Sequence, residues 1–179
     1  MCTKPLQRGM TLIELIVFIV IVSVGVVGLV SVINPMVRFS AEPMRQKQLM
    51  AVAESLLNEI VHQPYTWCDL EDDAALTATS YADCAHPQNT GSGESRTGTG
   101  PGTNFDNVAD YAGFSMNDFS DAAGNNVMTG YNVSVTVVPA GVALGVGSDD
   151  AALAITVTVT RDGQSFALTG YRFRYAPRS

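Results

Sequence analysis

Residues 10–33 read MTLIELIVFIVIVSVGVVGLVSVI, an apolar run that contains one acidic residue, Glu14, and no Lys or Arg. At a rise of 1.5 Å per residue this run makes a helix of about 36 Å, enough to cross a hydrocarbon core of about 30 Å. Lys4 and Arg8 precede the run, and such positive charge favours a cytoplasmic N-terminus with the rest of the chain across the membrane. We therefore expect one membrane-spanning segment.

The length and the acid of this run separate three interpretations. The run is too long for the apolar core of a secretory signal peptide, which holds about 7–15 residues. A plain membrane anchor accounts for the length but not for Glu14, since an acid deep in a membrane helix costs about 2.5–3.5 kcal/mol. Glu14 lies near the start of the run, so access to the interface lowers this cost. An acid in this place still favours a positively charged partner.

The stretch Arg8-Gly9-Met10-Thr11-Leu12-Ile13-Glu14 resembles the cleavage and methylation signal of type IV prepilins. The resemblance implies that prepilin peptidase cuts between Gly9 and Met10, so that residues 1–9 are a discarded leader and Met10 becomes an N-methylated terminus. It also implies that Glu14 pairs with a Met10 ammonium, most usefully that of a neighbouring subunit, during filament assembly. Most prepilins carry Phe where this chain has Met10, and Met has a similar bulk.

The same resemblance implies partners and a location. The expected partners are other pilins through the N-terminal helix, the prepilin peptidase and methylase, and an inner-membrane assembly platform. The globular part is expected in the periplasm first and then on the pilus. Residues 36–60 and 104–114 are further similar to minor pilins of mannose-sensitive haemagglutinin pili. The alternatives are a minor pseudopilin of type II secretion and a membrane-tethered domain of another function.

Glycines and prolines bear on how far the first helix runs. Gly25 and Gly28 lie inside the apolar run and suit either local melting or close packing on another helix. Asn34-Pro35 is expected to mark the end of the run or a kink, since proline lacks a backbone N–H. Pro43 suits the start of a further helical stretch, and Pro64 suits its end.

Residues 34–63 are expected to form the amphipathic half of the helix. Apolar side chains in this segment recur at spacings of three and four, which predicts one buried stripe. The stripe consists of Leu49, Val52, Ala53, Leu56, Leu57 and Ile60. The polar side chains expected mostly away from it are Arg45, Lys47, Glu54, Asn58 and Glu59.

Residues 131–179 are expected to form an antiparallel β-meander. Apolar and polar residues alternate over 131–138 and 155–160, and a third run covers 166–175. Asp162-Gly163, between the last two runs, is typical of a two-residue hairpin turn. The expected fold is therefore α+β, a long N-terminal helix packed on a C-terminal antiparallel sheet, as in pilins.

The cysteines predict a cross-link in the loop region 64–130. Cys2 falls in the leader, which leaves Cys68 and Cys84. An even pair in an exported domain favours a disulfide, worth about 3 kcal/mol for a loop of this length. The alternative is zinc held by these cysteines with His62 and His86, although the Cys-x-His spacing is unusual for structural zinc. Trp67 is expected to be a packing residue.

Two Gly-rich segments are expected to be surface connections. Residues 89–104 hold five glycines and a proline, a composition that predicts a mobile loop with no part in the core. The segment lacks the lysine of a nucleotide-binding loop. Residues 141–148 are expected to connect two strands.

The charge balance excludes some functions. The chain has a net charge of −7, and residues 69–150 carry twelve of its seventeen acids. This argues against nucleic-acid binding, so Arg172, Arg174 and Arg178 are expected in salt bridges. Neither histidine has a suitably spaced nucleophile once the cysteines pair, so no catalytic site and no cofactor are expected.

The acidic loops also suggest a calcium hypothesis, because calcium prefers oxygen ligands. Their spacing does not match an EF-hand, and Asx turns explain the same residues without a metal. The foremost candidates are Asp118, Asp121 and Asn125, and further donors are Asp106, Asp110 and Asn126.

Overall fold

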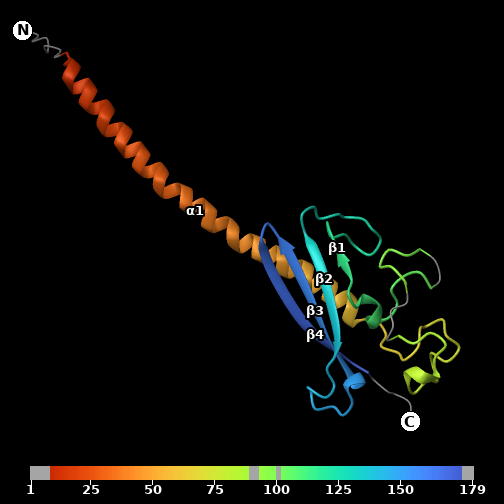
Figure 1. The fold of residues 1–179 in the computed structure, drawn as a ribbon. Coiled ribbons are helices and arrows are strands. Elements are labelled where there is room, and N and C mark those ends of the chain that lie inside the picture. The colour runs from red at the N-terminus through yellow and green to blue at the C-terminus, as the bar shows by residue number, and fades with distance from the viewer. Residues whose placement is uncertain (1–8, 89–92, 100–101, 175–179) are drawn as a thin grey trace, which may run out of the picture. The chain divides into compact units, whose positions relative to one another are not determined.

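The computed structural model describes residues 9–88, 93–99 and 102–174 (Figure 1). The chain divides into two compact units, residues 1–45 and residues 46–179. Its elements are, in order, α1 (Leu12–Val61), η1 (Tyr81–Asp83), η2 (Val108–Tyr111), β1 (Ser115–Met116), β2 (Asn132–Pro139), η3 (Asp149–Ala151), β3 (Ala152–Arg161) and β4 (Gln164–Phe173). The expected leader, apart from Gly9, lies outside the described residues.

The first unit contains the apolar part of α1. Residues Leu12–Ile33 have a mean hydropathy of 3.1 and none of them is buried, so this stretch is long and apolar enough to cross a membrane. Helix α1 continues through Asn34-Pro35 and through Pro43. The helix therefore neither ends at Asn34-Pro35 nor begins anew at Pro43, so these two expectations are wrong. The alternative of a kink at Asn34-Pro35 stays a prediction. Each proline removes only one hydrogen bond of the helical ladder, and the bonds on both sides hold the helix together.

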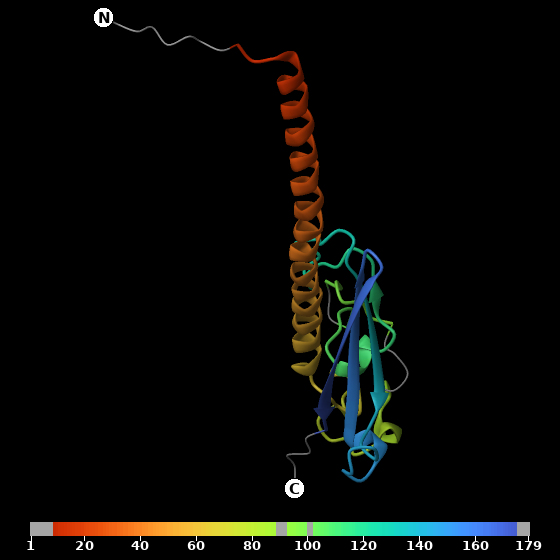
Figure 2. The same cartoon turned by 90° about the vertical axis from the view of Figure 1, so that its left-hand side faces the viewer.

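The second unit packs the C-terminal part of α1 on one face of the sheet (Figure 2). The predicted stripe is confirmed, since Leu49, Val52, Ala53, Leu56 and Ile60 are all buried. Leu57 packs at the margin of the core against Gly170 of β4, where a Cβ atom would lie 3.1 Å from the Leu57 methyl groups. Glycine therefore permits a close approach of strand and helix at this point. The sheet contributes Val133, Val135, Ile155, Val157 and Val159 to the same core.

The sheet has the order β1-β2-β3-β4, and each neighbouring pair is antiparallel. The meander predicted for the C-terminal part is confirmed. In its β3–β4 hairpin, Asp162 and Gly163 have φ angles of 49° and 77°, which is the left-handed geometry that this kind of turn requires. Strand β1 lies in the segment expected to be loop. Its two residues are too few to show an alternating pattern, so no periodicity predicts it.

Part of the Gly-rich segment 89–104 differs from the expected loop. Residues 89–92 and 100–101 lie outside the described residues, but Ser95 forms a bridge with Asn104 and its N–H donates to Thr103 O over 3.0 Å. Arg96, the next residue, is only 6% exposed. The expectation that this segment takes no part in the interior is therefore wrong at Arg96. An ion pair with Glu59 compensates the burial of this guanidinium.

The disulfide between Cys68 and Cys84 is confirmed. The alternative of zinc held by His62, Cys68, Cys84 and His86 is wrong, because both sulfur atoms are used in the disulfide. Trp67 packs against Tyr81, with their ring centroids 4.7 Å apart in an edge-to-face arrangement. The loop that follows α1 is thus held by a covalent link and by aromatic packing.

Candidate functional site

The expected cleavage position, between Gly9 and Met10, lies just before the start of α1. Met10 is 63% exposed and precedes the first helical residue, Leu12. The first turn is closed by the Leu15 N–H, which donates to Thr11 O over 3.2 Å. The Gly9–Met10 peptide bond therefore lies ahead of the helical hydrogen bonds.

Glu14 lies in this first turn and is exposed. The unpaired N–H groups of a helix N-terminus favour a negative charge there, typically by 0.3–1 kcal/mol. Neither of the ion pairs found among the described residues involves Glu14. Its carboxylate is thus compatible with a cation supplied from outside the described chain.

The apolar stretch satisfies its own polar groups. Ser23 Oγ donates to Ile19 O over 2.7 Å, and Ser31 Oγ donates to Gly28 O over 2.8 Å, as a lipid environment requires. A Cβ atom at Gly25 or Gly28 would meet nothing within 4 Å. No contact within the described chain requires these glycines, and both expected uses of them involve a lipid or a second chain.

Buried charges form a pair in the globular unit. Arg96 Nε and Nη2 donate to Glu59 Oε1 and Oε2 over 2.7 and 2.6 Å. Arg96 Nη1 donates to Ser120 O over 2.7 Å, and the Tyr111 hydroxyl donates to Glu59 Oε1 over 2.8 Å. Burial and the adjacent Glu59 carboxylate raise the pKa of Tyr111. This network joins α1 to η2 and to the loop segments that carry Arg96 and Ser120.

Sequence patterns placed Glu59 among the polar residues away from the core and did not single out Arg96. One signal was available, because Arg96 is the only Lys or Arg between Lys47 and Arg161. A lone cation among so many acids is a natural candidate for a buried pair.

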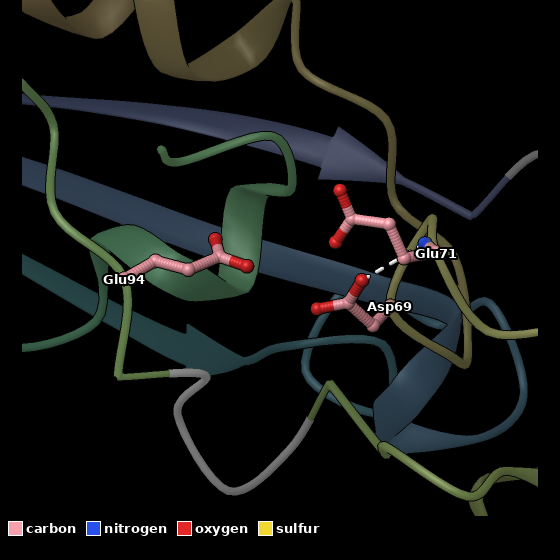
Figure 3. Close-up of side chains that lie close together, drawn as sticks. All are labelled: Asp69, Glu71 and Glu94. Atoms are coloured by element: carbon pink, nitrogen blue, oxygen red, sulfur yellow. Dashed lines mark hydrogen bonds between the residues drawn. The ribbon is translucent and has the colours of Figure 1, made fainter. Parts of the chain in front are cut away.

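Five carboxylates gather in the same unit: two come from the loop after α1, one from the Gly-rich segment, and two from η2 and the residues just before it. Ligand atoms of Asp69, Glu71 and Glu94 all lie within 4.8 Å of one another, and their side chains converge in Figure 3. Glu94 forms a second such group with Asp106 and Asp110. Desolvation, followed by the charges of Asp69, Asp110 and Glu71, raises the pKa of Asp106 to about 6. We name these five residues the acidic cluster.

Part of the acidic cluster is held by hydrogen bonds. Asp69 Oδ1 accepts from the Glu71 N–H over 2.9 Å, and Asp69 Oδ2 accepts from Gln88 Nε2 over 3.2 Å. Oxygen ligands of this kind suit calcium and magnesium. A bound cation relieves the repulsion among the negative charges of the cluster, and so does protonation of a carboxylate. Asp106 and Asp110 were among the oxygen donors expected from the acidic loops. Asp69, Glu71 and Glu94 were not, because only folding brings them near.

The foremost calcium candidates lie in hydrogen-bonded turns. Asp121 Oδ1 accepts from the N–H groups of Ala123 and Asn125 over 3.1 and 2.7 Å, and Asp118 Oδ1 accepts from the Gly130 N–H over 2.6 Å. Backbone hydrogen bonding, chiefly from Asn125, lowers the pKa of Asp121. These contacts account for the residue types without a metal. Calcium at Asp118, Asp121 and Asn125 stays a prediction.

Arg174 occupies an aromatic cage. Its Cζ lies 3.5 Å from the centroid of Trp67 and 3.8 Å from that of Tyr65. Its Nε donates to Asp150 O and its Nη2 to the Tyr81 hydroxyl, over 3.1 and 3.0 Å. The expected salt bridge is therefore wrong for Arg174 within the described residues, because stacked rings and hydrogen bonds stabilise its charge instead.

The other two arginines of that expectation have different outcomes. Arg172 belongs to neither of the ion pairs found among the described residues. Arg178 lies outside the described residues.

The apolar helix, the buried helix face and the antiparallel sheet together make a pilin-like α+β arrangement. Residues 4–30 match the family model of the prokaryotic N-terminal methylation motif. The chain thus carries the N-terminal motif of type IV prepilin-like proteins. No curated protein and no solved structure matches it.

Proposed function

We propose that this chain is a minor pilin that assembles through its N-terminal helix, and that its role is structural rather than catalytic. The observation that supports this most is the methylation motif at residues 4–30, carried on an apolar stretch with no buried residue. Such a stretch needs either lipid or other helices around it. A pilin uses both in turn, first in the inner membrane and then in the filament.

In the proposed mechanism, cleavage between Gly9 and Met10 releases a terminal amine, and N-methylation keeps that amine positively charged. Glu14 then receives this cation in an apolar setting, where an unpaired carboxylate is costly. Met10 precedes the first helical residue. Helix geometry therefore does not fix its amine next to the Glu14 carboxylate of the same chain. The amine of a neighbouring subunit is the proposed partner.

The proposed filament is a pilus of the mannose-sensitive haemagglutinin type, in which the chain resembles the D-type minor pilin. The resemblance of residues 36–60 and 104–114 supports this assignment. The subunit would lie in or at the tip of the pilus and serve its biogenesis and adhesion. A minor pseudopilin of type II secretion would use the same motif and the same charge pairing.

One experiment distinguishes a pilus subunit from a pseudopilin of type II secretion. The gene is deleted, and surface pili and protein secretion are scored in the same cultures, with complementation by the wild-type gene as the control. Loss of pili with normal secretion is expected, whereas loss of secretion with normal pili supports the pseudopilin.

Mass spectrometry of the mature protein should show a methylated Met10. A terminus at Met1 contradicts the proposed processing.

A further inference from the structure

Strand β4 lies at one edge of the sheet, where its only neighbouring strand is β3 (Figure 1). The Arg174 N–H, just after β4, donates to Ala151 O over 2.9 Å. Hydrogen-bonded and non-hydrogen-bonded pairs alternate along an antiparallel ladder, so every second residue back from Arg174 directs its N–H and C=O toward β3. The residues between them direct these groups to the free side of the strand. They are Ser165, Ala167, Thr169, Tyr171 and Phe173.

This free edge, made of those five residues, is open to another strand. All five are exposed, and their outward N–H and C=O groups form no hydrogen bond among the described residues. Proteins commonly protect such an edge with a lysine, a proline, a bulge or a very short strand. Strand β4 has ten residues in continuous register with β3, and it contains no lysine and no proline. The opposite edge strand, β1, has only two residues.

The side chains beside the free edge define which strand would fit. Phe166 and Leu168 pack at the margin of the core and stay partly exposed, so apolar side chains on an added strand would cover them. Arg172 lies on the same face of β4 and is its only charged residue. It belongs to neither ion pair among the described residues, and its Nε is buried without a hydrogen-bond partner there. Residues opposite each other in neighbouring strands have Cβ atoms about 4.5–5.5 Å apart, so an acid opposite Arg172 would give its charge a partner.

We propose that the free edge of β4 binds an extended segment of a partner protein, which adds to the sheet as an antiparallel fifth strand. Backbone hydrogen bonds supply the affinity in this mode of recognition, and alternate side chains supply the specificity. The segment carries an acid opposite Arg172 and apolar residues four and six positions later, opposite Leu168 and Phe166. A second copy of β4 does not meet this requirement, because β4 contains no acid. The inference does not rest on the proposed function, since binding is measured on the purified chain without a filament.

The probe is the capped and fluorescently labelled peptide Thr-Glu-Thr-Val-Thr-Val-Thr-Val-Thr. Paired with residues 165–173, it places its Glu opposite Arg172 and valines opposite Leu168 and Phe166. Fluorescence anisotropy measures its binding to the full chain in detergent, with empty micelles as the control. We expect a dissociation constant below about 100 μM, the range of a weak peptide complex.

Two methylated peptides test the backbone pairing. N-methylation at positions 3, 5 and 7 of the peptide removes N–H groups that face β4 and should abolish binding. N-methylation at positions 4, 6 and 8 removes the same number of N–H groups on the far side and should leave binding intact. Hydrogen exchange locates the site, because the peptide should slow exchange of the N–H groups of the free edge and not of those of Ser115 and Met116 in β1.

A charge comparison tests the role of Arg172. The wild-type chain should bind the Glu peptide about fivefold more tightly than the same peptide with Gln in its place. Arg172→Gln should bind both peptides alike, whereas Arg161→Gln, on β3 outside the paired segment, should keep the preference. Circular dichroism checks folding, and the methylated peptides decide the matter if Arg172→Gln does not fold. Absence of binding, equal binding of the two methylated peptides, an unchanged preference in folded Arg172→Gln, or a dimer whose free edge is protected without peptide overturns the proposal.

Discussion

Arg96 and Glu59 lie 37 residues apart in the chain and form a two-pronged ion pair, with N–O distances of 2.7 and 2.6 Å. The Arg96 side chain is 2% exposed and that of Glu59 is 23% exposed. Because burial removes solvent screening, either charge is costly when its partner is absent. The pair fixes the Gly-rich segment to the C-terminal part of α1.

Replacing one member of this pair should destabilise the globular unit strongly. Arg96→Gln leaves a carboxylate without its cation and is expected to lower the free energy of unfolding by about 3–5 kcal/mol. Urea unfolding of the full chain in detergent, followed by Trp67 fluorescence, measures the change. The control is Asp162→Asn, which breaks an exposed pair with Arg161 and should change stability by less than about 1 kcal/mol. Equal effects of the two substitutions would contradict a special role for the buried pair.

The features that could be predicted from the sequence are those set by neighbouring residues. The stripe from Leu49 to Ile60 follows from spacing along one helix, and Asp162-Gly163 specifies a turn by its own backbone preferences. The methylation motif is equally local. The contact between Arg96 and Glu59 and the full membership of the acidic cluster could not be predicted, because both depend on which segments meet after folding.

The disulfide should stabilise the loop after α1 and the aromatic cage together. Its cysteines are 16 residues apart, so replacing both by Ser is expected to lower the free energy of unfolding by about 3 kcal/mol. Trp67, the only tryptophan, reports the change directly because it stacks on Arg174. The comparison is Arg174→Lys, which keeps the charge but loses the planar stack and should alter Trp67 emission with a smaller loss of stability. Unchanged emission in the double Ser variant would show that the cage does not need the disulfide.

Asp106 should make stability depend on pH in the direction opposite to most carboxylates. Its pKa is raised from 3.8 to about 6, first by desolvation and then by neighbouring acids. Because the folded state binds this proton more tightly, the contribution of Asp106 to stability is greatest below pH 4 and is lost as the pH rises through about 6. Asp106→Asn should therefore stabilise the protein at pH 7 by about 1 kcal/mol after allowance for solvent screening.

The Asp106 effect is read as a difference between wild type and variant, because Asp72 and Asp121 have lowered pKa values and act in the other direction. Unfolding is measured from pH 4 to pH 7 in buffer with a chelator, so that no divalent cation masks the repulsion. The difference should shrink toward zero at the acidic end. A difference independent of pH would show that the substitution acts through packing and not through charge.

Glu14 should be required for assembly and not for membrane insertion. Glu14→Gln keeps the size and polarity of the side chain but removes the charge that the proposed Met10 amine would meet. The subunit is expected to be cleaved and to remain in the membrane, while its amount in sheared filaments falls at least tenfold. Immunoblots of membrane and filament fractions measure both. Glu54→Gln, at an exposed position of α1 outside the apolar stretch, is the matched control and should assemble normally. Normal incorporation of the Glu14→Gln subunit would show that the acid is not the partner of the amine.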